Sequence, residues 1–454
     1  MKVHFIAIGG SVMHNLAIAL KQKGYAVSGS DDDIYEPAKS NLLKYGLLPE
    51  YMGWNEERIS EDLDAVVLGM HAKSENPELN RAKQLGIKIY SYPEFIFEQS
   101  KNKKRVVIGG SHGKTTITAM VLHILKRKNL DFDYMVGASL EGFDVSVRLS
   151  ESAPVIILEG DEYPDSALNK LPKFLIYQPD IALLSGIAWD HINVFPTFEN
   201  YVLQFERFVD SIVKGGTLIF NSEDEIVRKI VAAANDTTNK IPYSIPEFSI
   251  VNHTTFLIRN GNKIALKIFG RHNLQNIMGA TAICKNLGVE ESDCLESLKD
   301  FTGASRRLEL LAASDTAAVY KDFAHSPSKL SASIAAVKEQ FPERKLVACL
   351  ELHTYSSVDV NFLKEYRGSM SDADIKIIFY ETHTSELKNT AMLDPGVIRF
   401  SFNDDKIIVF TEIRKLREFF LSQPWENATL LMMSSGNFSG LDLKDLSTFV
   451  ITHT

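Results

Sequence analysis

Short apolar runs alternate with segments of helical periodicity along the whole chain. The first hundred residues contain four runs of strand length, at Val3–Ile8, Tyr25–Ser28, Ala65–Leu68 and Ile87–Tyr90. Between the first two runs, apolar residues recur at helical spacing, at Met13, Leu16, Ala17 and Leu20. Strands that alternate with helices in this way predict a small parallel, doubly wound sheet.

The same alternation returns twice. A second group of runs lies at Arg105–Ile108, Val155–Leu158, Ile181–Leu184 and Thr217–Phe220. A third group lies at Ala317–Tyr320, Leu346–Cys349, Ile375–Tyr380, Ile407–Phe410 and Leu430–Met433. At about 150 residues per domain, a chain of 454 residues also suggests three domains. We therefore expect an α/β protein with domains at 1–101, 102–308 and 309–454, and with the polar, basic stretch Ser100–Arg105 as a solvated linker.

Composition limits the classes of partner. The apolar fraction of 45% and the charged fraction of 24% are typical of a globular protein. A formal net charge of −9 argues against nucleic acid as the main partner. The three cysteines are scattered, which fits a reduced compartment. The sequence has neither a signal-peptide pattern nor the roughly 20-residue apolar run that spans a bilayer, so we expect a cytoplasmic protein without a membrane partner.

The clearest chemical motif follows the strand Arg105–Ile108. It is the run Gly110, Ser111, His112, Gly113, Lys114, Thr115 and Thr116. A glycine-rich turn from strand to helix presents backbone N–H groups and the helix dipole to a phosphate. Lys114 can reach the terminal phosphates, and the Thr115 hydroxyl can take a Mg²⁺ position. Ile108 stands where a usual P-loop has its first glycine, so this is a shortened loop.

Acidic residues follow the next strand of this group. Glu159, Asp161 and Glu162 come at its end, where α/β proteins bind ligands. Mg²⁺ takes one or two carboxylates together with phosphate oxygens and water, so we choose Glu159 as the ligand. The alternative is a solvated acidic loop. One strand further along, Asp190–His191 could bind a second cation through a ring nitrogen, or could be structural.

Three later clusters carry groups suited to a nucleotide. Asn273 and Asn276 lie at a predicted helix start, where they could read an adenine edge or a ribose, or could cap the helix. The pair Arg306–Arg307 follows a glycine, and arginine makes bidentate bonds to phosphate. Asp322 and His325 stand beside a proline-fixed turn at the end of the first strand of the third group.

The first strand of the chain ends in a glycine turn, Gly9-Gly10-Ser11-Val12. A dinucleotide fingerprint would read GxGxxG with an acid about 20 residues further on. The acid is present as Asp31, but the glycine spacing differs. The turn suits a nucleotide whose diphosphate lies at the helix N-terminus, and the alternative is a tight packing turn.

In their order along the chain, these motifs resemble the Mur ligase family, whose members join amino acids or peptides to UDP-N-acetylmuramic acid. The resemblance covers nearly the whole chain and rests on the P-loop, Glu159, Asp190–His191, Gly270–Asn276, Arg307 and Asp322–Pro327. It implies a UDP-binding domain, an ATPase domain and a C-terminal Rossmann-like domain. It also implies ATP and Mg²⁺ as cofactors, and an acyl phosphate formed on UDP-N-acetylmuramate that a substrate amine attacks.

The resemblance assigns roles to single residues. Lys114, Glu159, His191 and Arg307 would form the catalytic set, and Lys114 would stabilise the transferring γ-phosphoryl group. Thr115 and Glu159 would hold one Mg²⁺, and His191 a second. The nucleotide would contact Gly110–Thr116, Asn273, Asn276, Arg307, Asp322 and His325. The UDP-sugar would contact Gly10, Ser11, Ser30, Asp31 and His71.

Two amines compete within this family. One is L-alanine, and the other is the whole tripeptide L-alanyl-γ-D-glutamyl-meso-diaminopimelate of cell-wall recycling. The first glycine turn, Tyr163 and the stretch Glu141–Ser150 resemble the peptide-adding members, so we expect the tripeptide. The chain departs from the family pattern at Gly186, commonly Asn, and at Lys321, often an acid. It also departs in the loop Glu351–Ser357, near the expected amine site.

Two other classes compete with a ligase. A dinucleotide-dependent oxidoreductase would fit two Rossmann-like units, but the broken glycine fingerprint and the P-loop oppose it. A regulatory protein with a degenerate nucleotide site would fit the fold, but the catalytic set is complete. We expect the ligase to be a monomer or a weak homodimer.

Overall fold

The computed structural model describes residues 1–137, 140, 142–164, 171–381 and 393–454. The chain divides into two compact units. The first comprises Met1–Ile187, Val202–Tyr243 and Gly279–Glu291. The second comprises Ala188–Tyr201, Ser244–Met278 and Ser292–Thr454. The predicted boundary at 101/102 lies inside the first unit and the one at 308/309 inside the second, so the division into three domains stays a prediction.

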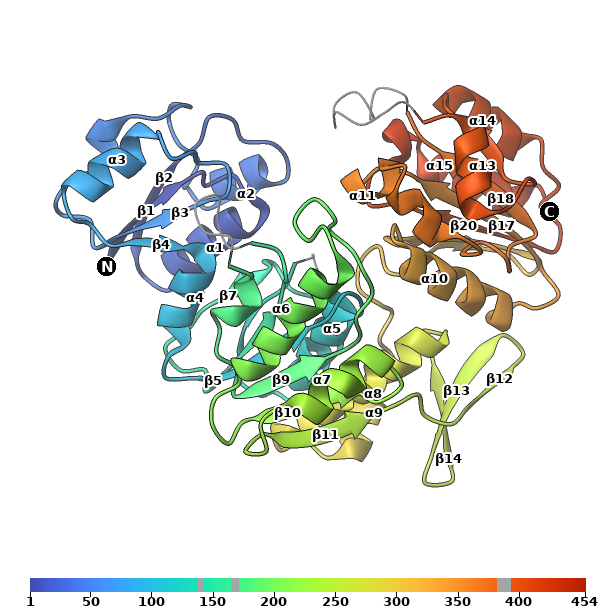
Figure 1. Ribbon diagram of the computed structural model, residues 1–454, viewed down its shortest axis with the longest axis horizontal. Helices are drawn as coiled ribbons and strands as arrows, with labels where there is room; N and C mark the ends of the chain where they lie inside the picture. Colours follow the sequence, from blue (N-terminus) through green and yellow to red (C-terminus); the bar gives the residue numbers. More distant parts are fainter. Residues whose placement is uncertain (138–139, 141, 165–170, 382–392) are drawn as a thin grey trace. The chain divides into compact units, whose positions relative to one another are not determined.

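The first unit begins with a four-stranded sheet. Its strands are β1 (Lys2–Ile6), β2 (Ala26–Ser30), β3 (Ala65–Leu68) and β4 (Ile89–Ser91). The accompanying helices are α1 (Ser11–Gln22), α2 (Ala38–Lys44), η1 (Glu56–Arg58), α3 (Pro77–Gln84) and α4 (Tyr92–Ser100). The strands lie in the order β2-β1-β3-β4 and all pairs are parallel, so the four predicted strands and their parallel arrangement are confirmed (Figure 1).

A seven-stranded sheet follows. Its strands are β5 (Lys104–Gly109), β6 (Asp133–Met135), β7 (Val147–Arg148), β8 (Val155–Glu159), β9 (Ile181–Leu184), β10 (Thr217–Asn221) and β11 (Asn239–Tyr243). Helices α5 (Lys114–Arg127), η2 (Lys173–Leu175) and α7 (Glu225–Ala233) belong to the first unit. Helices α6 (Phe198–Asp210) and α8 (Arg271–Asn286) each begin in the second unit and end in the first, and α9 (Glu291–Leu298) lies in the second apart from Glu291. The order is β11-β10-β9-β5-β8-β6-β7, with β7 antiparallel to β6 at the edge. Because β5 is central, its carboxyl end delivers the P-loop to the middle of the sheet edge.

The second unit contains a six-stranded sheet. Its strands are β15 (Glu309–Ala313), β16 (Ala317–Asp322), β17 (Lys345–Glu351), β18 (Ile375–Phe379), β19 (Ile408–Phe410) and β20 (Ala428–Met433). Its helices are α10 (Pro327–Gln340), α11 (Tyr355–Val358), η3 (Phe362–Tyr366), α13 (Pro395–Phe402), α14 (Ile413–Leu421), η4 (Phe438–Gly440) and α15 (Leu443–Thr452). The order is β15-β16-β20-β17-β18-β19, and β15 is antiparallel to β16.

Alternation along these strands explains the two layers of helices. Ala318 and Tyr320 of β16 pack in one core with Leu330 of α10, whereas Ala317 and Val319 pack in another core, on the opposite face. Successive side chains of a strand point to opposite faces, so a strand that is apolar throughout needs cover on both. Helices α10 and α13 supply it on one face, and α14 and α15 on the other.

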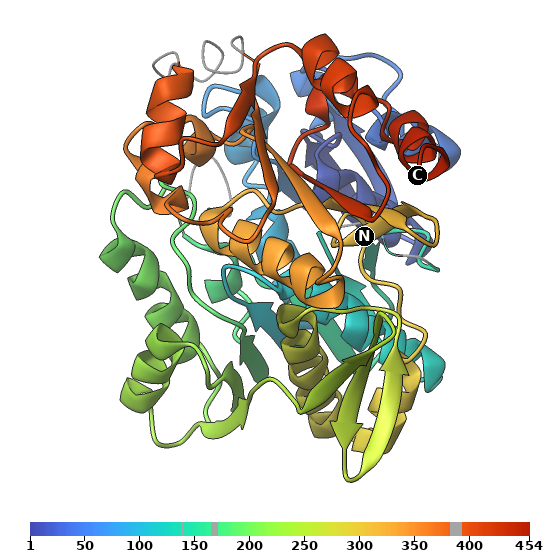
Figure 2. The ribbon, with the colours of Figure 1, turned by 90° about the vertical axis from the view of Figure 1, so that its right-hand side faces the viewer.

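A small antiparallel sheet, not anticipated from the sequence, also belongs to the second unit. It consists of β12 (Phe248–Val251), β13 (Thr254–Arg259) and β14 (Asn262–Leu266) in sequence order. Figure 2 shows it in yellow-green near α10. The Thr255 hydroxyl donates to Gln340 Oε1 at 2.8 Å, and Gln340 Nε2 donates to the His253 carbonyl, so these contacts attach the sheet to the end of α10.

The expected linker is more structured than its composition suggests. Arg105 is buried, and its guanidinium donates to the carbonyls of Gln178 at 3.0 Å and Ser100 at 3.2 Å. It also pairs with Asp180 at 3.3 Å. The interpretation as a solvated loop end therefore holds for Lys101 and Asn102 but is wrong for Arg105, which anchors the start of β5.

The α/β fold class predicted from the alternating pattern is confirmed. The three cysteines are buried and unpaired, as expected for a reduced protein. Within the described ranges, no helix has the length and apolarity that would carry it across a bilayer.

Candidate active site

The P-loop joins β5 to α5. Gly113, immediately before the first helical residue, has φ 78° and ψ −20°, a left-handed conformation that glycine adopts without steric cost. The Ser111 N–H donates to the carbonyl of Gly186 at 2.9 Å. The loop is therefore fixed by its own glycine and by the end of the neighbouring strand β9.

The glycines at this edge allow two backbones to approach closely. A Cβ atom on Gly110 would lie 2.1 Å from the Ser185 hydroxyl oxygen, and one on Gly186 would lie 2.1 Å from Cε1 of His112. The Ser185 hydroxyl donates to the His112 carbonyl, and the backbone N–H of Ser185 donates to the Gly109 carbonyl at 3.0 Å. At Gly186 the His112 ring therefore occupies the space that a side chain would need.

Lys114 is enclosed by negative groups. Its Nζ donates to Glu162 Oε2 at 2.7 Å and to the Gly110 carbonyl at 2.5 Å. Burial alone would lower the pKa of Lys114, but the carboxylates of Glu162 and Asp161 outweigh burial and hold it above its usual value. Lys114 therefore stays charged, as a group that stabilises a phosphoryl oxygen must.

Thr115 and Glu159 place two hard oxygen donors side by side. The Thr115 hydroxyl donates to Glu159 Oε1 at 2.6 Å, and Glu159 Oε2 accepts the N–H of Gly137 at 2.7 Å. A hydroxyl and a carboxylate next to a phosphate loop are the ligands that Mg²⁺ prefers, so these residues fit the ion. Among the described residues no group of three or more His, Cys, Asp and Glu forms a complete cation cage, and the phosphate oxygens of a bound nucleotide would have to complete the shell.

The loop after β8 contains a residue to which the sequence analysis gave no role. Glu162 is 1% exposed and pairs with Lys114. Asp161 instead pairs with Lys173 at 2.6 Å, and the Lys173 ammonium lies 5.7 Å from the Tyr163 ring centre. The three acids therefore have three different partners, and the Glu-Gly-Asp-Glu run alone could not distinguish them.

The predicted UDP-sugar residues lie at the carboxyl edge of the first sheet. Gly10 and Ser11 begin α1, and the Gly9 N–H donates to Asp31 Oδ2 at 2.7 Å. Burial raises the pKa of Asp31 to about 6, although the Gly9 N–H opposes the shift. Ser11 and His71 are exposed, whereas Ser30 is fully buried and donates its hydroxyl to Glu78.

In the second unit, Asp190 lies in a buried cluster with two basic side chains. Lys329 Nζ donates to Asp190 Oδ2 at 3.2 Å, and His325 Nε2 lies 3.7 Å from the same oxygen. Burial opposes ionisation, but Lys329 and His325 outweigh it and hold the pKa of Asp190 well below its usual value. Burial and Lys329 lower the pKa of His325, so its ring is neutral near pH 7. His191, next to Asp190, has a left-handed backbone with φ 55°.

Asp322 organises the turn that carries Arg307. One carboxylate oxygen accepts the N–H groups of Leu308 at 3.2 Å and Phe323 at 2.8 Å, and the other accepts the Ser333 hydroxyl. The Arg307 guanidinium lies 4.7 Å from the Phe323 ring centre. Asp322 therefore positions the turn with the same carboxylate that was predicted to contact ATP.

The two asparagines at the start of α8 differ. Asn273 Nδ2 donates to the Phe269 carbonyl at 2.9 Å, a bond that ties the helix start to the loop between β14 and α8. Asn276 is also buried, one turn further along α8. The first unit thus brings together the P-loop, Glu159 and the predicted UDP-sugar residues, and the second contains His191, Asn273, Asn276, Arg307, Asp322 and His325.

Sequence profiles of known families match most of the chain. Residues 2–104 match the profile described as Mur ligase family, catalytic domain. Residues 108–284 match the Mur ligase middle domain. The second match includes the P-loop, Glu159 and Asp190–His191.

Individual proteins are similar over nearly their full length. The UDP-N-acetylmuramate–L-alanine ligase of Caldicellulosiruptor bescii is 32% identical, with 86% of this chain and 85% of that protein covered. The crystal structure of a murein peptide ligase from Psychrobacter arcticus has a TM-score of 0.65 at 22% identity, with 100% and 99% covered. The UDP-N-acetylmuramate–alanine ligase of Thermotoga maritima has a TM-score of 0.69 at 20% identity, with 99% and 98% covered. At these identities the two structures establish the fold alone.

Proposed function

Because this chain belongs to the Mur ligase family, the ATP-dependent ligases of peptidoglycan synthesis, we propose that it joins L-alanyl-γ-D-glutamyl-meso-diaminopimelate to UDP-N-acetylmuramate. The family resemblance inferred from the motifs is confirmed, and so is the class of enzyme. The choice of amine and the roles of single residues are our proposals.

The observation that carries the ligase mechanism is the convergence at the P-loop of Lys114, Thr115 and Glu159. The muramyl carboxylate would attack the γ-phosphorus of ATP, ADP would leave, and Lys114 would stabilise the charge on the transferring oxygens. Bound Mg²⁺ would neutralise the crowded phosphate oxygens, with Thr115 and Glu159 as its protein ligands. The substrate amine would then displace phosphate from the acyl carbon.

The choice of the tripeptide rests on Tyr163. Peptide-adding members resemble this chain in having Tyr at this position, where alanine-adding members have Ser. The half-buried Tyr163 ring contacts the Lys173 ammonium, which in turn pairs with Asp161. A serine would remove this ring from Lys173, whose ammonium would keep the Tyr92 ring at 5.7 Å.

L-alanine is the second candidate amine. It is favoured by the name of the Caldicellulosiruptor bescii relative, an L-alanine ligase that matches this chain over 401 residues. Either amine would leave the phosphoryl-transfer chemistry at Lys114 unchanged, so the two candidates differ only in the acceptor.

Phosphate release with UDP-N-acetylmuramate, Mg²⁺ and ATP separates the candidates. We expect kcat/KM for the tripeptide to exceed that for L-alanine by at least about a hundredfold, or roughly 2.7 kcal/mol in transition-state binding. Preference for free alanine would overturn the choice of amine but keep the ligase. Tyr163→Phe should retain the preference and Tyr163→Ser should reduce it, with tripeptide KM as the readout.

A further inference from the structure

A short series of hydrogen bonds leads away from Glu159 toward the first sheet. The Gly137 N–H donates to Glu159 Oε2 at 2.7 Å. The preceding residue, Val136, donates its N–H to the Ser146 carbonyl at 3.0 Å. The Ser146 N–H in turn donates to Asn15 Oδ1 at 3.2 Å, across 131 positions of sequence. The Glu159 carboxylate is thus connected to a side chain of α1 through the backbone of two segments, Val136–Gly137 and Ser146.

The amide of Asn15 has a fixed orientation. Its oxygen faces Ser146, and its Nδ2 donates to the Ser11 carbonyl and to His14 Nε2, both at 2.9 Å. His14 Nδ1 lies 2.8 Å from the Gly10 carbonyl, so Nδ1 carries the proton and Nε2 accepts. Burial lowers the pKa of His14, which keeps this neutral tautomer. His14 and Asn15 together secure the carbonyls of the turn where the diphosphate is expected.

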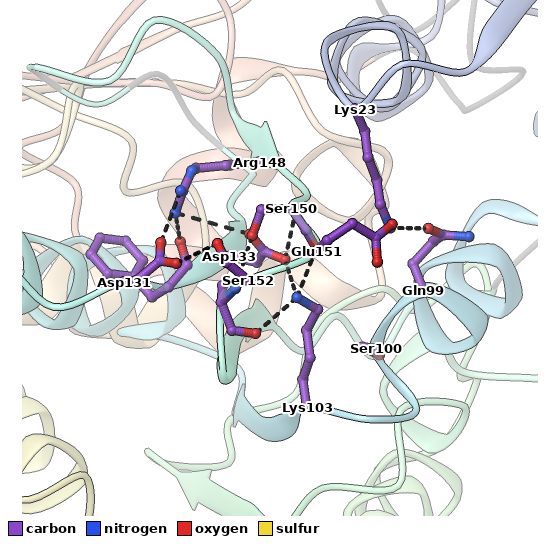
Figure 3. A network of polar contacts seen from close by, with 12 residues as sticks. Lys23, Gln99, Ser100, Lys103, Asp131, Asp133, Arg148, Ser150, Glu151 and Ser152 are labelled. Carbon is purple, nitrogen blue, oxygen red and sulfur yellow. Dashed lines mark hydrogen bonds and ion pairs between the residues drawn. The ribbon is translucent and has the colours of Figure 1, made fainter.

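The segment that carries Ser146 is fixed along its length. Figure 3 shows Asp133 between Lys103, at 2.9 Å, and Ser150, whose hydroxyl donates at 2.8 Å. The same view shows Lys23, just beyond the end of α1, pairing with Glu151 at 2.9 Å. Helix α1 is therefore attached to this segment at both ends, so a displacement of the Gly10–Ser11 turn would be transmitted to Gly137 rather than absorbed.

We propose that Asn15 is a positioning residue that couples the UDP-sugar site to the Mg²⁺–ATP site. The inference rests on the proposed function, which places the diphosphate at Gly10–Ser11 and the metal at Glu159. Occupation of the turn acts on Asn15 through the Ser11 carbonyl and, through Ser146 and Gly137, on the Glu159 carboxylate that the nucleotide needs. Coupling of binding is reciprocal, so each ligand raises the affinity for the other by the same factor.

The test measures binding rather than turnover. A non-hydrolysable ATP analogue with Mg²⁺ is titrated by calorimetry into the full chain, with and without saturating UDP-N-acetylmuramate. We expect the sugar nucleotide to tighten the analogue about fivefold or more in the wild type. Asn15→Leu, of similar volume, should reduce this ratio to about 1, and each ligand alone should still bind. Asn15→Asp keeps the acceptor for Ser146 but not the donor to Ser11, so its ratio should be intermediate.

Asn286 offers a matched control. Its Nδ2 donates to the Ala282 carbonyl at 2.9 Å, the same bond within a helix that Asn15 makes to Ser11. Asn286→Leu should keep the wild-type ratio. A wild-type ratio in folded Asn15→Leu, or no coupling in the wild type, would overturn the inference and leave the proposed function intact. Failure of the wild type to bind UDP-N-acetylmuramate would overturn the proposed function itself.

Discussion

At the scale of single residues, Lys114 and Glu162 depend on each other. Lys114→Ala should reduce phosphate release at least about a thousandfold, because charge on the γ-phosphoryl oxygens loses its nearest cation. Binding of UDP-N-acetylmuramate should survive, because Gly10 and Ser11 lie on the other sheet of the first unit. The measurements are a phosphate-release assay and calorimetric titration with the sugar nucleotide.

A double variant separates catalysis from stability in this pair. Removing Lys114 alone takes its ammonium away from the buried Glu162 carboxylate, and breaking such a buried pair costs about 3–5 kcal/mol of folding free energy. Lys114→Ala combined with Glu162→Ala should recover much of the lost Tm but none of the activity. Loss of UDP-N-acetylmuramate binding in the stable double variant would contradict the placement of the two sites.

Asp31 gives a prediction about pH. Its pKa of about 6 in the folded protein exceeds the usual 3.8 of an aspartate. Between pH 3.8 and about pH 6, Asp31 is protonated in the native state and ionised in the unfolded chain. The contribution of Asp31 to the free energy of unfolding is therefore fully present below pH 3.8 and is lost as the pH rises through about 6. The Tm of Asp31→Asn minus that of the wild type should therefore become more positive from about pH 4.5 to about pH 7.5. The same difference for Asp236→Asn, an exposed position, is the control. A difference for Asp31→Asn that is flat across this range would show that burial does not oppose its charge.

Of the residues at the site, some could be predicted from the sequence and others could not. Glu159 could be chosen because it comes at the end of an apolar run in the same predicted domain as the P-loop, and in the structure that strand, β8, pairs with β5. Glu162 could not, because its contact with Lys114 depends on how the loop after β8 folds back. Asn15 carried no signal at all, since helical spacing does not reveal that its amide meets Ser146.

At the scale of elements, the P-loop approaches the end of β9 so closely that adding one methyl group at Gly110 should disrupt the loop. Gly110 has φ +132° and its Cβ would collide with Ser185, so Gly110→Ala should cost at least about 1–3 kcal/mol and abolish binding of an ATP analogue. Thermal unfolding and nucleotide titration measure the two effects.

Gly215 is the matched control for that substitution. It has φ +78°, but a Cβ there would meet nothing within 4 Å. Gly215→Ala should therefore show only the conformational cost, about 1–2 kcal/mol, with nucleotide binding unchanged. Equal nucleotide binding by the two variants would mean that the loop can open away from β9 without loss of its phosphate-binding form.

Strands that are buried on both faces were predictable, and half-exposed ones were not. The runs at Ala65–Leu68 and Ile181–Leu184 match β3 and β9 residue for residue, because a parallel strand between two helix layers is apolar throughout. The strands β12 and β14 have partly exposed faces and mixed composition, so no continuous apolar run marks them. Their existence depends on the second unit, against which they pack.

At the scale of the whole molecule, the buried pair Lys103–Asp133 predicts how the chain responds to damage. Lys103→Met would take the Lys103 ammonium, at 2.9 Å, from the fully buried Asp133 and leave it with Arg148 at 4.0 Å, at a cost of up to about 3–5 kcal/mol. Amide exchange should accelerate in β6 and β8 of the first unit and stay unchanged in β16 and β17 of the second. Lys104→Met, at the exposed neighbouring position, should leave amide exchange unchanged in both units. Uniform acceleration in both units would show that they open together.

The division into units was the least predictable property at this scale. Domain boundaries predicted from the alternation of strands and helices assume that each domain is one continuous stretch of chain. Here Ala188–Tyr201 and Ser244–Met278 belong to the second unit, although both are flanked by chain of the first. Only long-range packing decides such membership, and periodicity carries no information about it.

The interleaving of the two units has a consequence for biosynthesis. The first unit begins at Met1 but is completed by Gly279–Glu291, and the chain passes between the units five times. At about 5–20 residues per second, a ribosome delivers that last segment only well after β5 and the P-loop have emerged. In the interval the nascent chain carries all seven strands of the sheet but lacks Gly279–Glu291, the last segment of the first unit, while it makes β12–β14 of the second unit. The first unit is therefore completed only after part of the second has been synthesised, an order that a protein with consecutive domains does not have.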